Sequence, residues 1–137
     1  LAKEKPGAVL LLEGYNNLLF PCAFGVSGSQ ACSEAITAVG FGIRDLIRIV
    51  KRPEYGVRYI LVSTLTPPGP FLGIPPDRRI ANDAIVRANT GITNMVRSEG
   101  ATLVDTYPKF IGHEAEYTDQ DGLHLRPAGY QALADSF

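Results

Sequence analysis

Apolar residues alternate along the chain between short continuous runs and longer stretches with helical spacing. Residues 8–13 (AVLLLE), 58–63 (RYILVS) and 101–105 (ATLVD) are short runs rich in branched aliphatic side chains. Runs of this length and composition predict strands. For residues 8–13 we expect burial on both faces, as in a parallel sheet.

Two longer segments carry apolar residues every three or four positions, which predicts amphipathic helices over residues 34–51 and 78–99. Ser33 is a suitable N-cap for the first helix, and Gly100 is a natural residue to follow the second. A third helix is predicted to begin at Pro127, since proline is favoured in the first turn.

The predicted order is strand, helix, strand, helix, strand, helix. This alternation predicts an α/β fold with a parallel sheet, right-handed crossovers and helices on both faces. Residues 17–32 and 109–121 are expected to be irregular, and residues 64–77 form a long proline-rich loop. We expect one domain over residues 1–137.

Composition argues against a nucleic-acid-binding or a membrane-spanning protein. The net charge of −1 argues against a nucleic-acid partner, and no apolar run reaches membrane-spanning length. Residues 1–7 do not resemble a signal peptide, and both ends look truncated. Cys22 and Cys32 flank a Gly/Ser loop. A disulfide is expected if the protein is secreted or periplasmic, a location that is slightly favoured, and two free thiols remain the alternative.

Two segments carry candidate chemistry. Gly14, Tyr15 and Asn16 follow the first predicted strand, at the edge of an α/β sheet where ligands bind. Asp121 and His124 lie one turn apart just before the last helix. A carboxylate bonded to one ring nitrogen fixes the tautomer of a histidine base. An amide such as that of Asn16 can donate a hydrogen bond to a developing oxyanion.

Each segment also has an ordinary structural explanation. Asp-x-x-His is common by chance, and a histidine in a loop is usually solvated. Gly-x-Asn often marks only a turn, because both residues tolerate positive φ. Their occurrence together, in this order on this strand–helix pattern, is much more specific.

These residues resemble motifs of the SGNH (GDSL-type) hydrolases. VLLLEGYNNL resembles the third block of that family, Gly-x-Asn-Asp, and DGLHLRPAGYQALA resembles the fifth, Asp-x-x-His. GATLVDTYPKF resembles the final strand and the turn after it. The resemblance implies a three-layer α/β/α, flavodoxin-like fold. It implies Asn16 as the oxyanion-hole side chain, His124 as the base and Asp121 as its orienting acid, with no cofactor and no metal.

The sequence departs from the family pattern in three ways. Asn17 replaces the usual Asp of the third block, and Leu125 replaces the usual Pro after the histidine. The largest departure is that the first two strands, with the nucleophilic Ser and an oxyanion Gly, have no counterpart. We therefore expect a partial SGNH domain. An N-terminal segment of the same protein would supply the serine and cover the otherwise bare edge of residues 8–13.

Other nucleophile and metal candidates are weaker. Ser27 lies in a Gly/Ser loop that lacks the strand and helix required by a nucleophile elbow, and Ser63 ends a strand without glycine neighbours. His113 has no second histidine or cysteine pair nearby, so a solvated side chain is expected rather than a metal ligand.

The predicted substrate is a small-molecule ester, of unspecified type. Phe20 and Phe71 lie in the two long loops and are candidate contacts for an apolar substrate portion, together with Gly14 and Tyr15 beside the oxyanion residue. The alternative is that the phenylalanines close the ends of the core. Two rival functions also remain: a non-catalytic SGNH-like binding module, and an α/β structural domain whose motifs match by accident.

Overall fold

A computed structural model describes residues 3–137, apart from the side chain of Pro76. Its strands are β1 (Ala8–Leu11), β2 (Tyr59–Ser63) and β3 (Thr102–Val104), which form one parallel sheet in the order β1-β2-β3. Val9 pairs with Ile60, and Val62 with Leu103. The predicted α/β class and the parallel sheet are confirmed.

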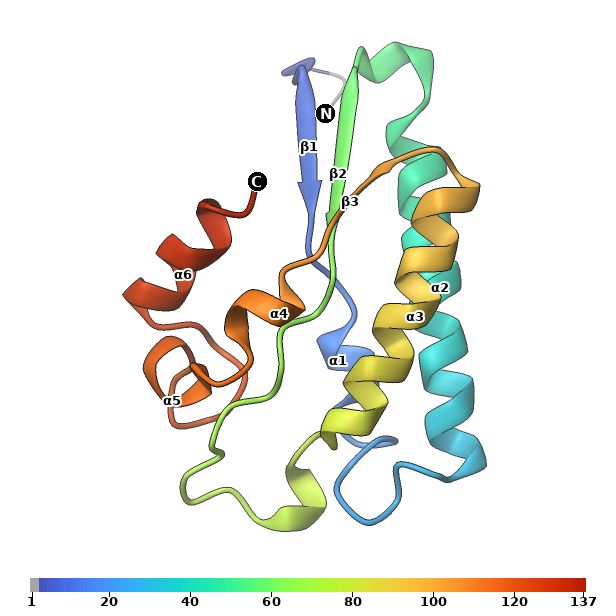
Figure 1. Cartoon of the computed structure of the whole chain (residues 1–137). Coiled ribbons are helices and arrows are strands. Elements are labelled where there is room, and N and C mark those ends of the chain that lie inside the picture. The colour runs from blue at the N-terminus through green and yellow to red at the C-terminus, as the bar shows by residue number, and fades with distance from the viewer. Residues whose placement is uncertain (1–2) are drawn as a thin grey trace.

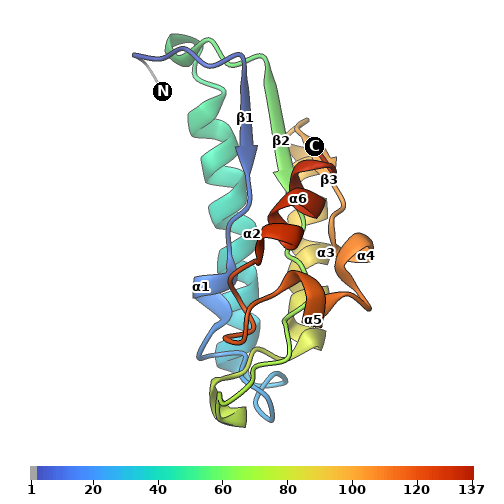
Figure 2. The same cartoon turned by 90° about the vertical axis from the view of Figure 1, so that its left-hand side faces the viewer.

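Two long helices lie on one face of the sheet, α2 (Gln30–Val50) and α3 (Asn82–Ser98), as Figure 1 shows. The short helix α6 (Pro127–Ala134) lies on the other face, in front of the strands in Figure 2. Four-residue helices α1 (Tyr15–Leu18), α4 (Tyr107–Phe110) and α5 (Glu114–Tyr117) and two 3-10 turns, η1 (Pro53–Tyr55) and η2 (Pro76–Arg78), complete the fold.

The core lies between the sheet and the two long helices. Ile60 and Val62 of β2 are buried there, with Val9 and Leu11 of β1 packed beside them. Side chains alternate along a strand, so Leu10 points to the opposite face, where it is 57% exposed. The prediction that the first strand is buried on both faces is therefore wrong. Among the described residues, β1 pairs with β2 alone and forms one edge of the sheet.

Several element boundaries differ from the predictions for identifiable reasons. The first strand ends at Leu11 rather than at residue 13. Helix α2 begins four residues earlier than predicted, because the side chain of Ser29 accepts a hydrogen bond from the backbone N–H of Cys32. Helix α3 begins later, because Ile80 forms a β-bridge with Ala23. Residues 109–121 contain α5 and the end of α4, where no helix was predicted.

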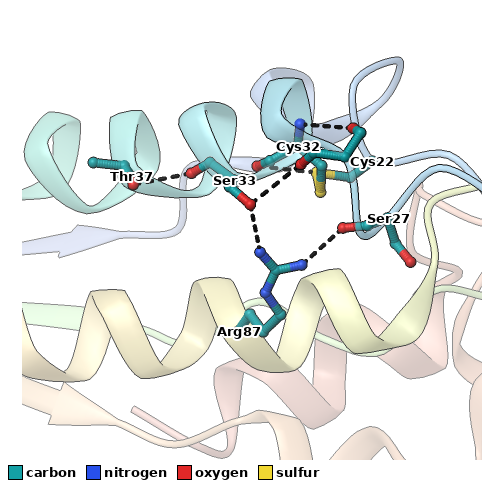
Figure 3. Close-up of a disulfide and its surroundings, with 7 residues drawn as sticks. Cys22, Ser27, Cys32, Ser33, Thr37 and Arg87 are labelled. Carbon is teal, nitrogen blue, oxygen red and sulfur yellow. Dashed lines mark hydrogen bonds between the residues drawn. A yellow bond between two sulfur atoms is a disulfide. The ribbon is translucent and has the colours of Figure 1, made fainter.

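A disulfide joins Cys22 to Cys32, which decides between the two alternatives left by the sequence. Both cysteines are fully buried. Figure 3 shows Arg87 of α3 reaching across to this region, where it donates hydrogen bonds to the backbone oxygen of Ser27 and to the hydroxyl of Ser33. The Gly/Ser loop is thus fastened to both long helices.

No helix of the described residues is long and apolar enough to cross a membrane.

Candidate active site

Asp121 and His124 form a closely bonded pair in the turn before α6. Nδ1 of His124 lies 2.5 Å from Oδ2 of Asp121. Oδ1 of the same carboxylate accepts hydrogen bonds from the backbone N–H groups of Leu123, at 2.9 Å, and of His124, at 3.0 Å. An ionised carboxylate can only accept, so Nδ1 carries the proton that it donates to Asp121. Nε2 is then the nitrogen that can act as a base.

The two side chains shift one another's protonation. Partial burial opposes ionisation of Asp121. The hydrogen bonds from His124 and from the two backbone N–H groups outweigh this effect and hold the pKa of Asp121 below its ordinary value. The hydrogen bond to Asp121, and then the attraction between the opposite charges, raises the pKa of His124. The pair favours the imidazolium that a general base forms when it takes a proton.

The second part of the site is the turn between β1 and α1. Gly14 occupies the N-cap position of α1 with a φ of 131°, a value that side-chain-bearing residues rarely adopt. A Cβ atom at this position would also lie only 2.8 Å from Cγ1 of Val39. Both observations explain why glycine stands here. Helix α1 forms with Asn17 as its third residue, so the replacement of the family's usual Asp by Asn17 does not prevent the turn.

Tyr15 fixes this turn to the loop after β2. Its hydroxyl donates a hydrogen bond to the backbone oxygen of Thr66 and lies 2.9 Å from the hydroxyl of the same residue. Burial raises the pKa of Tyr15 well above its ordinary range, and the hydrogen bond to Thr66 offsets this only in part. Tyr15 therefore stays neutral. It lines the pocket and fixes the turn to Thr66, and it does not transfer protons.

The two motifs meet in one pocket of about 240 Å³. Asn16 and His124 both line it, although they stand near opposite ends of the sequence. The remaining lining residues follow β1, follow β2, or belong to α6 and the turn before it. They are Leu12, Glu13, Gly14, Tyr15, Thr66, Leu123, Leu125 and Tyr130. Thr66 and Tyr130 were not predicted from the sequence. Thr66 could have been found from its position after a parallel strand, because ligands bind at the carboxyl ends of such strands.

The two candidate phenylalanines lie outside this lining. Phe71 is 5% exposed and belongs to the hydrophobic core cluster. Its burial favours the alternative in which it closes the end of the core. Phe20 is 74% exposed, in the loop that follows α1.

No serine lines this pocket among the residues that the structure describes. Ser63 is fully buried, and its hydroxyl donates to the backbone oxygen of Thr64 and lies 2.8 Å from the hydroxyl of Thr106. Ser27 belongs to the loop that Arg87 fastens to α3. His113 is stacked on Tyr117 and lies 3.3 Å from Glu116, outside the pocket. Residues 3–137 contain no group of three or more metal-binding side chains.

Comparison with known proteins decides the family. The model of the GDSL-like lipase/acylhydrolase family matches residues 1–132, nearly the whole chain. The chain belongs to the GDSL-like lipase/acylhydrolase family. The resemblance predicted from the two sequence blocks is thereby confirmed. A search of curated proteins found no match.

Solved structures show the same GDSL-like fold at low sequence identity. A protein described as a GDSL-like lipase from Parabacteroides merdae has a TM-score of 0.72 and 15% identity, over 98% of this chain and 60% of its own. An acetylxylan esterase from Geobacillus stearothermophilus has a TM-score of 0.68 and 19% identity, over 100% of this chain and 60% of its own. A GDSL-like lipase from Bacteroides thetaiotaomicron has a TM-score of 0.65 and 16% identity, over 95% of this chain and 59% of its own.

The present GDSL-like chain therefore spans about 60% of the length of these relatives. The shared part contains both motifs that meet in the pocket.

Proposed function

We propose that this chain supplies the base and an oxyanion donor of a carboxylic-ester hydrolase. The nucleophilic serine would come from a segment of the same protein outside this sequence. One observation carries the proposal: Asn16 and His124 line the same pocket, and Asp121 is hydrogen-bonded to the other ring nitrogen of that histidine. Membership of an acylhydrolase family supports it.

The residues would divide the chemistry as follows. Nε2 of His124 takes the proton of the serine hydroxyl while the serine oxygen bonds to the ester carbonyl carbon. The amide of Asn16 donates a hydrogen bond to the resulting oxyanion. His124 then returns the proton to the leaving alcohol as the carbon–oxygen bond breaks, and an acyl-serine remains. His124 then takes a proton from a water molecule as the water oxygen bonds to the acyl carbon. The bond from this carbon to the serine oxygen breaks, His124 returns the proton to the serine oxygen, and the acid leaves.

Two features of the sheet favour an additional segment beside β1. The edge of β1 that faces away from β2 has no strand partner among residues 3–137, and a bare strand edge is an aggregation hazard. On the face that carries α6, Leu10 of β1 and Tyr59 of β2 are 57% and 63% exposed. A strand pairing with β1 would satisfy the edge, and its connecting chain would cover these side chains.

A non-catalytic binding module is the second candidate. The absence of serine from the lining of the pocket, among the described residues, favours it. The bonded Asp121–His124 pair argues against it, because binding alone does not require an oriented imidazole.

A serine-reactive fluorophosphonate separates the two candidates. We expect the full-length protein to be labelled on a serine outside this sequence, as mapped by mass spectrometry, and the 137-residue chain to remain unlabelled. His124→Gln should abolish labelling, and Asn16→Ala should lower kcat for an ester about 100- to 1,000-fold. His113→Gln is the matched control and should leave both unchanged. Folded full-length protein that neither reacts nor hydrolyses esters would support the binding module.

Phe20 supports a proposal about the substrate. Its exposed ring lies in the loop beyond α1, which carries the oxyanion residue, so we propose that it contacts an apolar acyl or alcohol portion. In the full-length protein, Phe20→Ser should lower kcat/KM for an octanoyl ester more than for the acetyl ester of the same alcohol. Equal effects on both esters would contradict this contact.

A further inference from the structure

The proline-rich loop after β2 lies against the turn that carries Asp121 and His124. The backbone N–H of Gly69 donates a hydrogen bond of 2.9 Å to the oxygen of Gly122. The ring of Phe71 fills the space beside Gly122: a Cβ atom at Gly122 would lie 2.3–2.6 Å from three carbons of that ring. The loop therefore contacts the turn at the residue immediately after the carboxylate.

A second close contact secures the segment that leads into this turn. A Cβ atom at Gly69 would lie 2.6 Å from Cγ2 of Thr118 and 3.1 Å from the Cα of Gly122. Thr118 is in turn bridged to Leu125, on the far side of His124. The loop thus contacts Thr118 and Gly122 directly, and the bridge links Thr118 to Leu125 beyond the histidine.

Phe71 itself adopts an unfavourable backbone conformation. Its φ is 50°, in the left-handed region that favours glycine. A bulky residue persists there only where its surroundings compensate the cost, and the ring of Phe71 is almost completely buried. The ring, rather than the backbone, is the reason for phenylalanine at this position.

We propose that Phe71 is a positioning residue, whose ring holds the Asp121–His124 turn at the geometry that keeps the two side chains bonded. Its importance for catalysis rests on the proposed function. Its effect on the pair does not, because the contact with Gly122 exists in the absence of substrate.

The test uses nuclear magnetic resonance titration of His124 in the full-length protein. Phe71→Ala removes the ring, and Phe71→Gly removes both the ring and the strained φ. If Phe71→Ala folds poorly only because alanine keeps the strained φ, Phe71→Gly should still fold well. Leu72→Ala is the matched control, since Leu72 is the exposed neighbour in the same loop.

We expect both Phe71 variants to move the pKa of His124 toward its ordinary value, as its contact with Asp121 loosens. The other nearby carboxylate, Asp119, acts on His124 through charge alone and cannot replace this hydrogen bond. In the Leu72→Ala protein, His124 should titrate as in the wild type. An unchanged His124 titration in folded Phe71→Gly protein would overturn the proposal.

A double-mutant cycle tests the contact itself. Gly122→Ala should destabilise the wild type more than it destabilises the Phe71→Ala protein, because the clash with the ring is then gone. Equal destabilisation in both backgrounds would overturn the contact. If the full-length protein hydrolyses esters, Phe71→Ala should lower kcat about 10- to 100-fold and shift its pH profile in the direction of the His124 titration. If it has no activity, the titration and the cycle still decide the role of Phe71.

Discussion

The side-chain amide of Asn89 forms two hydrogen bonds with the backbone of Leu65. Its Oδ1 accepts from the N–H of Leu65 at 2.7 Å, and its Nδ2 donates to the oxygen of Leu65 at 2.9 Å. Asn89 belongs to α3, and Leu65 lies just beyond the end of β2. The amide thus satisfies the buried N–H and oxygen of Leu65, as the backbone of a neighbouring strand would. It also fixes the position of the next residue, Thr66, to which Tyr15 is hydrogen-bonded.

Replacement of this amide should be costly. Asn89→Ala leaves the N–H and the oxygen of Leu65 buried without these partners, so we expect the free energy of unfolding to fall by about 1–3 kcal/mol. Urea denaturation followed by circular dichroism measures the change. Asn94→Ala is the matched control, because Asn94 is exposed on the same helix, and it should change stability little. A similar loss in both variants would contradict the role of Asn89.

The turn that carries Asn16 should require glycine at position 14, because a side chain there would meet Val39. Gly14→Ala combines a strained φ with a contact of 2.8 Å to Val39, and such overpacking should destabilise the protein by about 1–3 kcal/mol beyond the cost of the backbone conformation. Gly25→Ala isolates the conformational cost, because φ is 91° there and nothing lies within 4 Å of the added Cβ. Thermal unfolding of both variants gives the difference, and equal losses would show that Val39 adapts.

The disulfide should stabilise the protein mainly by restricting the unfolded chain. Cys22 and Cys32 are separated by 10 positions, and closing a loop of this size contributes about 2–3 kcal/mol. We therefore expect Cys22→Ser/Cys32→Ser protein to unfold at a lower urea concentration than the wild type, and added reductant to have no effect on the variant. Arg87→Ala removes the two neighbouring hydrogen bonds while keeping the disulfide, and should cost less.

The Asp121–His124 pair should give stability a specific pH dependence. The lowered pKa of Asp121 means that its contribution is present above the ordinary value of 3.8 and is lost as pH falls through the lowered value. The raised pKa of His124 means that its contribution is present below 6.5 and is lost as pH rises through the raised value. Both contributions are complete between these two ordinary values.

Asp121→Asn tests this window, because the amide oxygen can still accept the two backbone hydrogen bonds. The difference in Tm between wild type and variant should be small, since His124 is 77% exposed, and largest between pH 3.8 and 6.5. The pKa of His124 should fall in the variant. A Tm difference that is constant from pH 3 to pH 9 would contradict the assignment.

The pattern of apolar positions predicted the succession of three strands and three main helices, and with it the parallel sheet. Apolar side chains with a period of two or 3.6 report which face of an element is buried, and that information is local. Boundaries were less predictable, because they depend on distant partners. Helix α2 begins beside the disulfide, and α3 begins after the bridge between Ile80 and Ala23.

The sequence by itself determined the chemical types at the site. It supplied a carboxylate and a histidine one turn apart and an amide after a strand, and the blocks around them identified the family. Only the tertiary structure decided that Asn16 and His124 line one pocket, that Phe71 is buried against Gly122 and that Phe20 is exposed. These relations join segments far apart in the chain. They arise when the sheet and its crossing helices close around a common core, which no local pattern of residues records.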